Sequence, residues 1–430
     1  MTAPSSVAPD AVRRGSVAVF AVFFLNGFNF ASWASRLPAV RDGLHLQPDQ
    51  MGLVLLAASV GSLVSLPLSG IVVQRLGPRR TVTVFAAANA TGLTVAALGV
   101  QARSVPLVVL ALVLFGVGTG VWDAAMNFEG AAVEQRLGRT VMPRYHAGFS
   151  FGTVVAAALA AGAAGLGVPV VVNVPVAVGL SFLGVLLAVR SFLPSSVPAA
   201  PVVAAPADED VLVDPAVVTP APRRSAFAAW TEPRTLLIGL VVLAAALAEG
   251  AANDWVSLAV VDGFDVSHAL GAFSFGVFVT AMTTTRLLGT YALDRYGRVA
   301  VLRASALFGL VGLAVFGTVG PLWLALLGVV LWGAGAALGF PVGMSAASDD
   351  PAHAAPRLAV VSTIGYSAFL AGPPLLGLLA QHVGYRHALL AIIVPVLAGL
   401  LVVGAAAPLP AAPARAAADD GDDGSDGDPA

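Results

Sequence analysis

Arg75-Leu76-Gly77-Pro78-Arg79-Arg80 forms a short basic segment between two long apolar stretches, and Asp294-Arg295-Tyr296-Gly297-Arg298 repeats its pattern in the second half of the chain. Each copy places arginines around a glycine where one apolar stretch gives way to the next. A junction that recurs at matching places indicates an internal duplication. The repeat therefore predicts a chain built from two related halves.

The composition favours a membrane protein. The chain has 430 residues, of which 58% are hydrophobic and 11% are charged, whereas soluble proteins carry about 25% charged residues. The net charge of −2 argues against nucleic acid as a partner. Because the chain contains no cysteine, it has neither a disulfide framework nor thiol chemistry. We therefore expect much of its surface to face the lipid bilayer.

Twelve stretches approach the length needed to span a bilayer, which is about 20 mainly apolar residues. The expected spans are residues 16–36, 50–73, 81–101, 105–129, 146–165, 168–191, 235–259, 267–288, 299–319, 321–346, 358–380 and 387–407. Together with the repeat, they predict an all-α integral membrane fold with twelve transmembrane helices in two pseudo-symmetric six-helix bundles.

The arginines indicate the orientation, because cytoplasmic loops of membrane proteins are enriched in basic residues. With the N-terminus inside, 17 of the 22 basic residues fall on the cytoplasmic side. Only Arg36, Arg41, Arg103 and Arg386 fall outside, and Arg286 is expected near the inner end of the eighth span. We therefore expect a multi-pass protein of the cytoplasmic (inner) membrane with both termini in the cytoplasm.

Changes in composition predict five segments. They are a cytoplasmic arm at 1–15, a first bundle at 16–192, a linker at 193–233, a second bundle at 234–408 and an acidic tail at 409–430. The linker is rich in Pro, Ala and Ser, which is typical of a mobile connection. The aspartates of the tail lie among Gly and Ala without the terminal Glu of a calcium-binding loop, so we expect a disordered tail.

The halves match at two further places. Leu114-Phe115-Gly116-Val117-Gly118 parallels Leu331-Trp332-Gly333-Ala334-Gly335, and Asn26-Gly27 parallels Glu249-Gly250. With the twelve spans, the central linker and the repeated loop, the chain resembles the major facilitator superfamily of transporters over residues 16–407. The resemblance implies two bundles that rock about a central site.

The loop signature of that family reads Gly, three residues, Asp, Arg, any residue, Gly, any residue and two basic residues. Its matching residues here are Gly70, Arg75, Gly77, Arg79 and Arg80 in the first copy and Asp294, Arg295, Gly297 and Arg298 in the second. The resemblance implies that the loop latches the cytoplasmic ends of helices. Gln74 replaces the acidic residue of the first copy, so we expect a weaker latch there.

A closer resemblance rests on three segments. They are Gly27-Phe28-Asn29-Phe30-Ala31-Ser32-Trp33-Ala34-Ser35-Arg36-Leu37-Pro38, Trp122-Asp123-Ala124-Ala125-Met126-Asn127 and Glu249-Gly250-Ala251-Ala252-Asn253-Asp254-Trp255. They look like the subgroup that includes the rhizopine-associated MosC membrane protein. This resemblance narrows the architecture more than the cargo.

Two carboxylates are expected near the middle of the bilayer, one in each half. Asp123 precedes Arg136 by 13 residues and Glu249 follows Arg234 by 15 residues, so each lies about 20 Å from its inner basic flank at 1.5 Å per residue. Transporter substrate and ion sites lie at this depth. We expect Glu249, together with Asp123, to couple transport to protons. The alternative is that each carboxylate only pairs with a neighbouring helix.

Polar residues share helix faces with these carboxylates, because positions i and i+4 align on a helix. The expected cavity residues are Asn26, Asn29, Trp33, Thr119, Asn127, Asn253, Ser362 and Tyr366. Alternative interpretations stay open for three kinds of residue. The asparagines could join helices by hydrogen bonds, Trp33 and Trp255 could form an interfacial belt, and Tyr366 could belong to the core.

The chemistry of the sequence favours transport. Because no catalytic set, metal-ligand cluster or nucleotide-binding loop occurs, we expect neither an enzyme nor a bound metal or cofactor. The sequence predicts a monomeric secondary transporter that moves a small polar organic solute, sugar- or polyol-like, by alternating access with coupled protons. The alternatives are a drug or metabolite efflux carrier and a membrane sensor that binds a ligand without moving it.

Overall fold

The structure is a computed structural model that describes residues 9–138, 141–193, 228–350 and 353–409. The acidic tail from residue 410, the arm before residue 9 and the linker residues 194–227 lie outside the described residues, so the expectations about them stay predictions. Helix α1 already begins at Pro9, inside the stretch predicted as a cytoplasmic arm.

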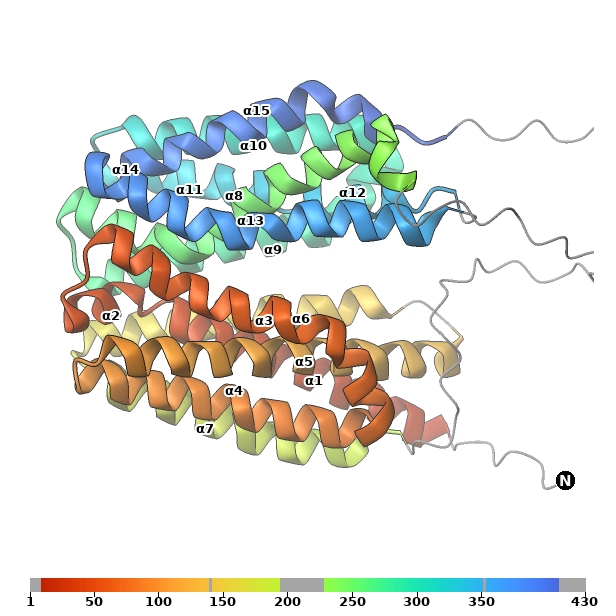
Figure 1. The fold of residues 1–430 in the computed structure, drawn as a ribbon, viewed down its shortest axis with the longest axis horizontal. Coiled ribbons are helices and arrows are strands. Elements are labelled where there is room, and N and C mark those ends of the chain that lie inside the picture. The colour runs from red at the N-terminus through yellow and green to blue at the C-terminus, as the bar shows by residue number, and fades with distance from the viewer. Residues whose placement is uncertain (1–8, 139–140, 194–227, 351–352, 410–430) are drawn as a thin grey trace, which may run out of the picture.

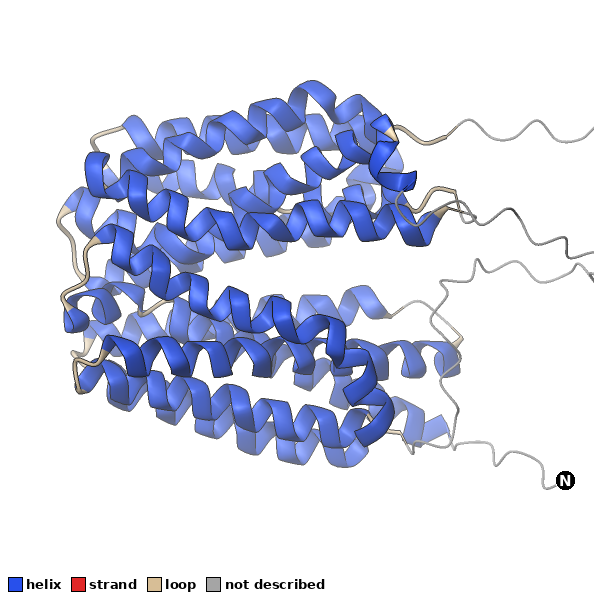
Figure 2. Cartoon of the chain, viewed as in Figure 1, coloured by secondary structure: helices blue, strands red, loops and turns tan. Residues whose placement is uncertain are grey.

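The helices form two bundles (Figures 1 and 2). The first contains α1 (Pro9–Ala34), α2 (Leu37–Leu44), α3 (Pro48–Leu76), α4 (Pro78–Gln101), α5 (Val105–Leu137), α6 (Met142–Gly165), α7 (Val170–Ala188) and η1 (Val189–Ser191). The second contains η3 (Ala228–Thr231), α8 (Pro233–Phe264), α9 (His268–Tyr296), α10 (Arg298–Thr318), α11 (Leu322–Ala336), α12 (Gly339–Ala347), α13 (Ala354–Val383), α14 (Tyr385–Ala388), η4 (Leu389–Ile392), α15 (Ile393–Val402) and η5 (Val403–Ala406). The short α2 lies between spans, and α11–α12 and α14–η5 each make one broken span. The twelve predicted transmembrane helices are thereby confirmed within the described residues.

Eleven of the twelve spans are long and apolar enough by composition to cross a membrane. The other is α9, whose 29 residues are long enough to cross. It is more polar because it carries Thr280, a run of threonines at 283–285 and Arg286. A polar helix inside a membrane protein faces other helices or a polar space more readily than lipid.

The repeated loop has the same backbone in both copies. Gly77 joins α3 to α4 with φ 75° and ψ 157°, and Gly297 joins α9 to α10 with φ 76° and ψ 163°. Glycine adopts positive φ at little cost because it has no Cβ. The duplication seen in the sequence is therefore a structural duplication of a sharp turn between two spans.

The two bundles meet at one end of the molecule. We call this end, where α2 lies, the α2 end, and the opposite end, where α1 begins and α15 finishes, the terminal end. Figure 1 shows the ribbons of the two bundles close together at the α2 end and apart at the terminal end. The bundles touch mainly through α3 with α13 and α6 with α9.

Small residues allow the close approach of α3 and α13. A Cβ added to Gly52 would lie 2.5 Å from the carbonyl oxygen of Pro373, and one added to Gly377 would lie 2.6 Å from that of Pro48. Backbones can pack this closely in membranes only where side chains are small. These contacts join the bundles in the half of each helix nearest the α2 end.

Candidate functional site

Glu249 on α8 and Arg286 on α9 form an ion pair inside the second bundle. A terminal nitrogen of Arg286 donates to Oε2 of Glu249 at 2.8 Å, and the two side chains are 31% and 20% exposed, respectively. The Nε of Arg286 also donates to the carbonyl of Ala337 at 3.1 Å. Ala337 lies in the break between α11 and α12, where backbone groups lack the regular helical pattern. The broken helix thus helps to hold the guanidinium beside Glu249.

The position of Arg286 corrects its predicted role. The sequence placed it near the inner end of its span, next to the cytoplasmic loops. The structure instead pairs it with a residue in the middle of α8, because α9 continues past Arg286 to Tyr296. An arginine within a span was itself a signal that it contributes to the site, since such charges are costly unless paired.

Asp123 on α5 is half-buried, and its carboxylate makes no hydrogen bond or ion pair with any described residue. Its backbone carbonyl accepts a hydrogen bond from Asn127 at 2.9 Å. Tyr366, on α13 of the other bundle, lies within electrostatic range of Asp123 and is 37% exposed. Tyr366 is therefore not a core tyrosine, and that interpretation is wrong.

The two bundles bring polar side chains towards each other. His146 on α6 lies within electrostatic range of Arg286 on α9, just as Asp123 on α5 lies within range of Tyr366 on α13. Two groups result, one of Glu249, Arg286 and His146 and one of Asp123 and Tyr366. We call these five residues together the central polar cluster. Sequence reasoning predicted Asp123, Glu249 and Tyr366 as site residues and missed the two basic members.

Two of the polar candidates and one further asparagine form a hydrogen-bonded chain within the first bundle. Asn29 on α1 donates to Asn89 on α4 at 2.8 Å, and Asn89 donates to Thr119 on α5 at 3.0 Å. Asn29 and Asn89 are each 1% exposed. The contacts match the alternative interpretation in which amides join helices. Asn89 was not predicted, because a lone asparagine in an apolar stretch does not reveal its partners.

The remaining polar candidates lie on separate helices. Asn26 donates to the sulfur of Met126 at 3.6 Å, and Ser362 donates to that of Met344 at 3.7 Å. Asn253 on α8 is half-buried. Sulfur is a weak acceptor, so Asn26 and Ser362 keep hydrogen-bonding capacity in this conformation, and the Oδ1 of Asn26 is buried without a partner.

Trp33 and Trp255 do not belong to an interfacial belt. Trp33 is 5% exposed and Trp255 is 1% exposed, whereas a belt residue needs contact with the bilayer surface. Trp255 packs against Tyr385, with ring centroids 5.5 Å apart. The belt interpretation is therefore wrong for both, because each lies towards the protein interior near the α2 end. The side chain of Trp33 is packed within the core rather than presented to a solute.

A charge cluster joins the bundles at the α2 end. Arg41 on α2 pairs with Asp42 at 2.7 Å and with Asp262 on α8 at 2.5 Å, and Nε2 of His268 on α9 lies 2.8 Å from Asp42. The hydrogen bond with His268 and that with Arg41 hold the pKa of Asp42 below its usual value, against the effect of desolvation. Although burial opposes it, the bonds to Asp262 and Asp42 raise the pKa of Arg41. We call Arg41, Asp42, Asp262 and His268 the α2-end charge cluster.

At the terminal end, the second copy of the repeated loop is held by ion pairs. Arg298 lies 2.9 Å from Asp349 beyond α12, and Arg234 on α8 lies 2.8 Å from the same carboxylate. Nearby, the Arg357 hydrogen bond holds the pKa of Glu232 below its usual value. Asp294, the carboxylate of the loop signature, is exposed. In this conformation the ion pair of the second copy is therefore made by Arg298.

The first copy of the loop has fewer contacts. Arg75, Arg79 and Arg80 are exposed and make no ion pair with any described residue, and a Cβ at Gly70 would meet nothing within 4 Å. The expectation that the copy containing Gln74 forms a weaker latch stays a prediction.

Comparison with known proteins places the chain among transporters. The model of the Major Facilitator Superfamily matches residues 19–355 and 238–424. An uncharacterized transporter of Sinorhizobium fredii is 33% identical over 394 residues, covering 88% of this chain and 97% of the relative. The membrane protein MosC of Rhizobium meliloti is 27% identical over 372 residues, covering 86% and 85%. The predicted resemblance to MosC is thereby confirmed.

Solved structures share the fold. The nucleoside transporter NupG superposes with a TM-score of 0.69 at 17% identity, covering 91% of this chain and 98% of that one. A D-xylose-proton symporter superposes with a TM-score of 0.66 at 15% identity, covering 92% and 97%. At this level of identity the likeness supports the arrangement of helices alone.

Proposed function

This chain belongs to the major facilitator superfamily, and from that premise we propose that it carries a small polar organic solute across the cytoplasmic membrane by alternating access, with coupled proton movement. Structures of the same fold that are named as a nucleoside transporter and a D-xylose-proton symporter support a polar cargo. The half-buried amides and hydroxyls on α5, α8 and α13 support it from the chain itself.

The arginines orient the structure. Most of them lie at the terminal end, which the positive-inside rule assigns to the cytoplasm. The bundles are joined at the α2 end, so this conformation is closed to the outside and faces inward. In alternating access, the opposite conformation would part α3 from α13 and α6 from α9.

The single observation that carries the proton-coupling proposal is the Glu249–Arg286 ion pair. Protonation of Glu249 removes its negative charge and frees Arg286 from the pair. A partly accessible pair in the middle of two helices can make this exchange with water, unlike a fully sealed one. The freed guanidinium then changes the electrostatic field at His146, which lies within range of it on the other bundle.

Asp123 and Tyr366 lie on different bundles, within electrostatic range of each other. The carboxylate has no partner within the described residues, and the tyrosine lies across from it on the other bundle. A solute that hydrogen-bonds both would link the halves while it is bound. Such a link gives the solute different affinities for the two conformations, which is what couples binding to rocking.

Glu249→Gln tests the proton-coupling role. In proteoliposomes under an imposed pH gradient, we expect wild type to show saturable, solute-dependent proton movement with one or more of a panel of sugars, polyols and amines. The variant should lose the pH-driven component, because glutamine cannot release a proton. It should keep exchange of solute at equal pH, because glutamine resembles the protonated acid.

The matched control is Asp265→Asn. Asp265 ends α8 with φ 51° and is exposed, and asparagine tolerates this backbone conformation. This variant should behave as wild type. Unchanged pH-driven transport in Glu249→Gln would show that Glu249 is structural. If folded wild-type protein shows no solute-dependent proton movement with any member of the panel, the proposal of a small polar cargo is contradicted.

A further inference from the structure

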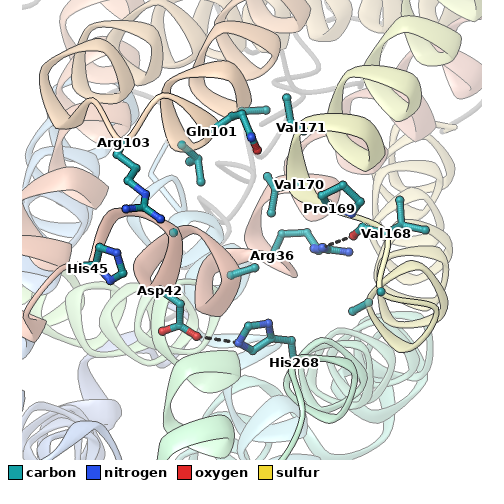
Figure 3. Close-up of a pocket in the computed structure, with 16 residues that line it drawn as sticks. Arg36, Asp42, His45, Gln101, Arg103, Val168, Pro169, Val170, Val171 and His268 are labelled. Carbon is teal, nitrogen blue, oxygen red and sulfur yellow. Dashed lines mark hydrogen bonds and ion pairs between the residues drawn. The ribbon is translucent and has the colours of Figure 1, made fainter.

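A cavity of 430 Å³ lies at the α2 end, apart from the central polar cluster. Its walls come from α2 and the turn before it, the end of α4 and the α4–α5 loop, the α6–α7 loop with the start of α7, and the start of α9. Figure 3 shows Arg103 and His45 on one side of it and Arg36 on the other, with Asp42 and His268 along the lower edge. Most of the titratable side chains in this wall are basic.

Arg36 is a buried cation without a counterion. The residue is 4% exposed, and no carboxylate of a described residue lies within ion-pair distance of it. One terminal nitrogen donates to the carbonyl of Val168 at 2.7 Å, and the other reaches Asn173 at 3.5 Å. Its Nε is buried without an acceptor. Burial lowers the pKa of Arg36, as expected where a charge is desolvated and not neutralised.

The acidic residue in the wall does not neutralise these cations. Asp42 is already engaged by Arg41 and His268. Arg103, which is exposed in the α4–α5 loop, makes no ion pair with any described residue. The cavity is also lined by Val170 and Val171, which open α7. The positive end of that helix dipole therefore adds to the field of the arginines.

We propose that this cavity binds an oxyanion, namely a phosphate group, between Arg36 and Arg103 when the α2 end is closed. Arginine suits this role because its planar set of donors matches the oxygens of phosphate. His268 comes from the second bundle, whereas the two arginines come from the first. An anion in the cavity therefore contacts both bundles only in the closed conformation and stabilises it.

Two sources could supply the group, a free anion outside the cell or the headgroup of a lipid. The chemistry of recognition is the same in both. The proposal concerns the α2 end and does not require that the central polar cluster bind a proton or a solute, so its test is independent of transport.

The test is the thermal unfolding of the purified full-length chain in a neutral detergent, with increasing inorganic phosphate. A ligand that binds the folded state raises the unfolding midpoint in a saturable way. We expect this rise in phosphate and not in sodium chloride of matched ionic strength. Arg103→Gln should move the half-maximal phosphate concentration upward about tenfold, the effect of one lost charge-assisted hydrogen bond.

Arg303→Gln is the control, because Arg303 is an exposed arginine on α10, far from the cavity in the other bundle. It should respond to phosphate as wild type does. Arg36→Gln should abolish the response. If that variant does not fold, the phosphate response of Arg103→Gln decides the outcome, because Arg103 is exposed. No saturable rise in wild type, or an equal response in Arg103→Gln, would overturn the proposal.

Nanodiscs distinguish the two sources. If a headgroup fills the cavity, the phosphate response seen in detergent should disappear in phosphatidylglycerol nanodiscs, and the wild type should be more stable than Arg103→Gln in them. If a free anion fills it, the response should persist in nanodiscs. Either result supports the phosphate-binding cavity and assigns its source.

Discussion

Three carboxylates within the helices lie in different environments. The partner of each carboxylate indicates whether its role is structural or is the functional one proposed here. Glu129 on α5 is 2% exposed and accepts a hydrogen bond from the backbone N–H of Leu193 at 2.8 Å. Glu249 pairs with Arg286, and Asp123 has no described partner. A carboxylate committed to the backbone stabilises the fold, whereas one that faces another side chain or a polar space can exchange partners.

Glycines at helix contacts make a prediction about stability. A Cβ added to Gly152 on α6 would clash with the carbonyl oxygen of Phe24 on α1, whereas one added to Gly162 would meet nothing within 4 Å. Gly152→Ala should therefore force α1 and α6 apart and destabilise the fold by about 1–3 kcal/mol or more, the usual cost of overpacking. Thermal unfolding in detergent measures the change.

Gly162→Ala is the control for that substitution. It adds the same methyl group to the same helix in open space, so its midpoint should equal or exceed that of wild type, since alanine favours a helix over glycine. Equal midpoints for the two variants would show that α1 and α6 do not pack as described.

The residues that sequence reasoning could identify are those whose signal is local. An acid in an apolar stretch identified Asp123 and Glu249, and a basic residue in a span could have identified Arg286 and His146. The partners could not be predicted, because the pairing of Asn29 with Asn89 or of Arg36 with Val168 depends on which helices pack together. One sequence does not encode that choice in any local pattern.

At the scale of elements, α2 is the helix that was not predicted from the sequence. It is too short to span a membrane, and the stretch that contains it reads as a loop between spans. The structure makes it the carrier of Arg41 and Asp42, which reach α8 and α9 of the other bundle. The span count was predictable because each misplaced span would reverse the side on which all later arginines fall.

The contact of α2 with α9 should weaken in acid. The hydrogen bond with His268 and that with Arg41 lower the pKa of Asp42 from its ordinary value of 3.8. A lowered pKa means that the folded state favours the ionised carboxylate, so its contribution is present above pH 3.8 and is lost as the pH falls through the lowered pKa. Wild type should have the higher unfolding midpoint at mildly acidic pH, and its difference from Asp42→Asn should shrink below pH 3.8.

Asp265→Asn serves as the comparison for that pH series, since Asp265 makes no ion pair with any described residue. Its midpoint should follow that of wild type throughout. A difference between wild type and Asp42→Asn that does not shrink below pH 3.8 would contradict the assigned contacts.

At the scale of the whole molecule, the two bundles share one architecture, but different kinds of ion pair form at the two ends of the molecule. At the terminal end, ion pairs form within the second bundle, through Arg298, Arg234 and Asp349. At the α2 end, ion pairs cross between bundles, through Arg41 and Asp262. Pairs within a bundle survive rocking, whereas pairs between bundles must break for the α2 end to open. The α2-end charge cluster is therefore the natural gate of the proposed cycle.

The duplication could be predicted from the sequence, because it follows from a pattern that recurs along the chain. The orientation rests on the distribution of arginines and stays a prediction. The conformation could not be predicted from the sequence. Whether the bundles meet at one end or the other depends on a small difference in free energy between two packings of the same helices. If the protein alternates between these packings, its sequence must be compatible with both.

A disulfide across the α2 end tests the central claim most directly. A Cβ at Gly165 on α6 would lie 3.7 Å from the Cβ of Ala269 on α9, within the roughly 3.5–4.5 Å that a disulfide needs. The chain has no cysteine of its own, so Gly165→Cys combined with Ala269→Cys gives one defined cross-link. The measurement is pH-gradient-driven solute uptake in proteoliposomes before oxidation, after oxidation and after reduction. Alternating access predicts that oxidation stops uptake, that reduction restores it and that neither single cysteine has this effect. Undiminished uptake through a fully cross-linked protein would contradict it.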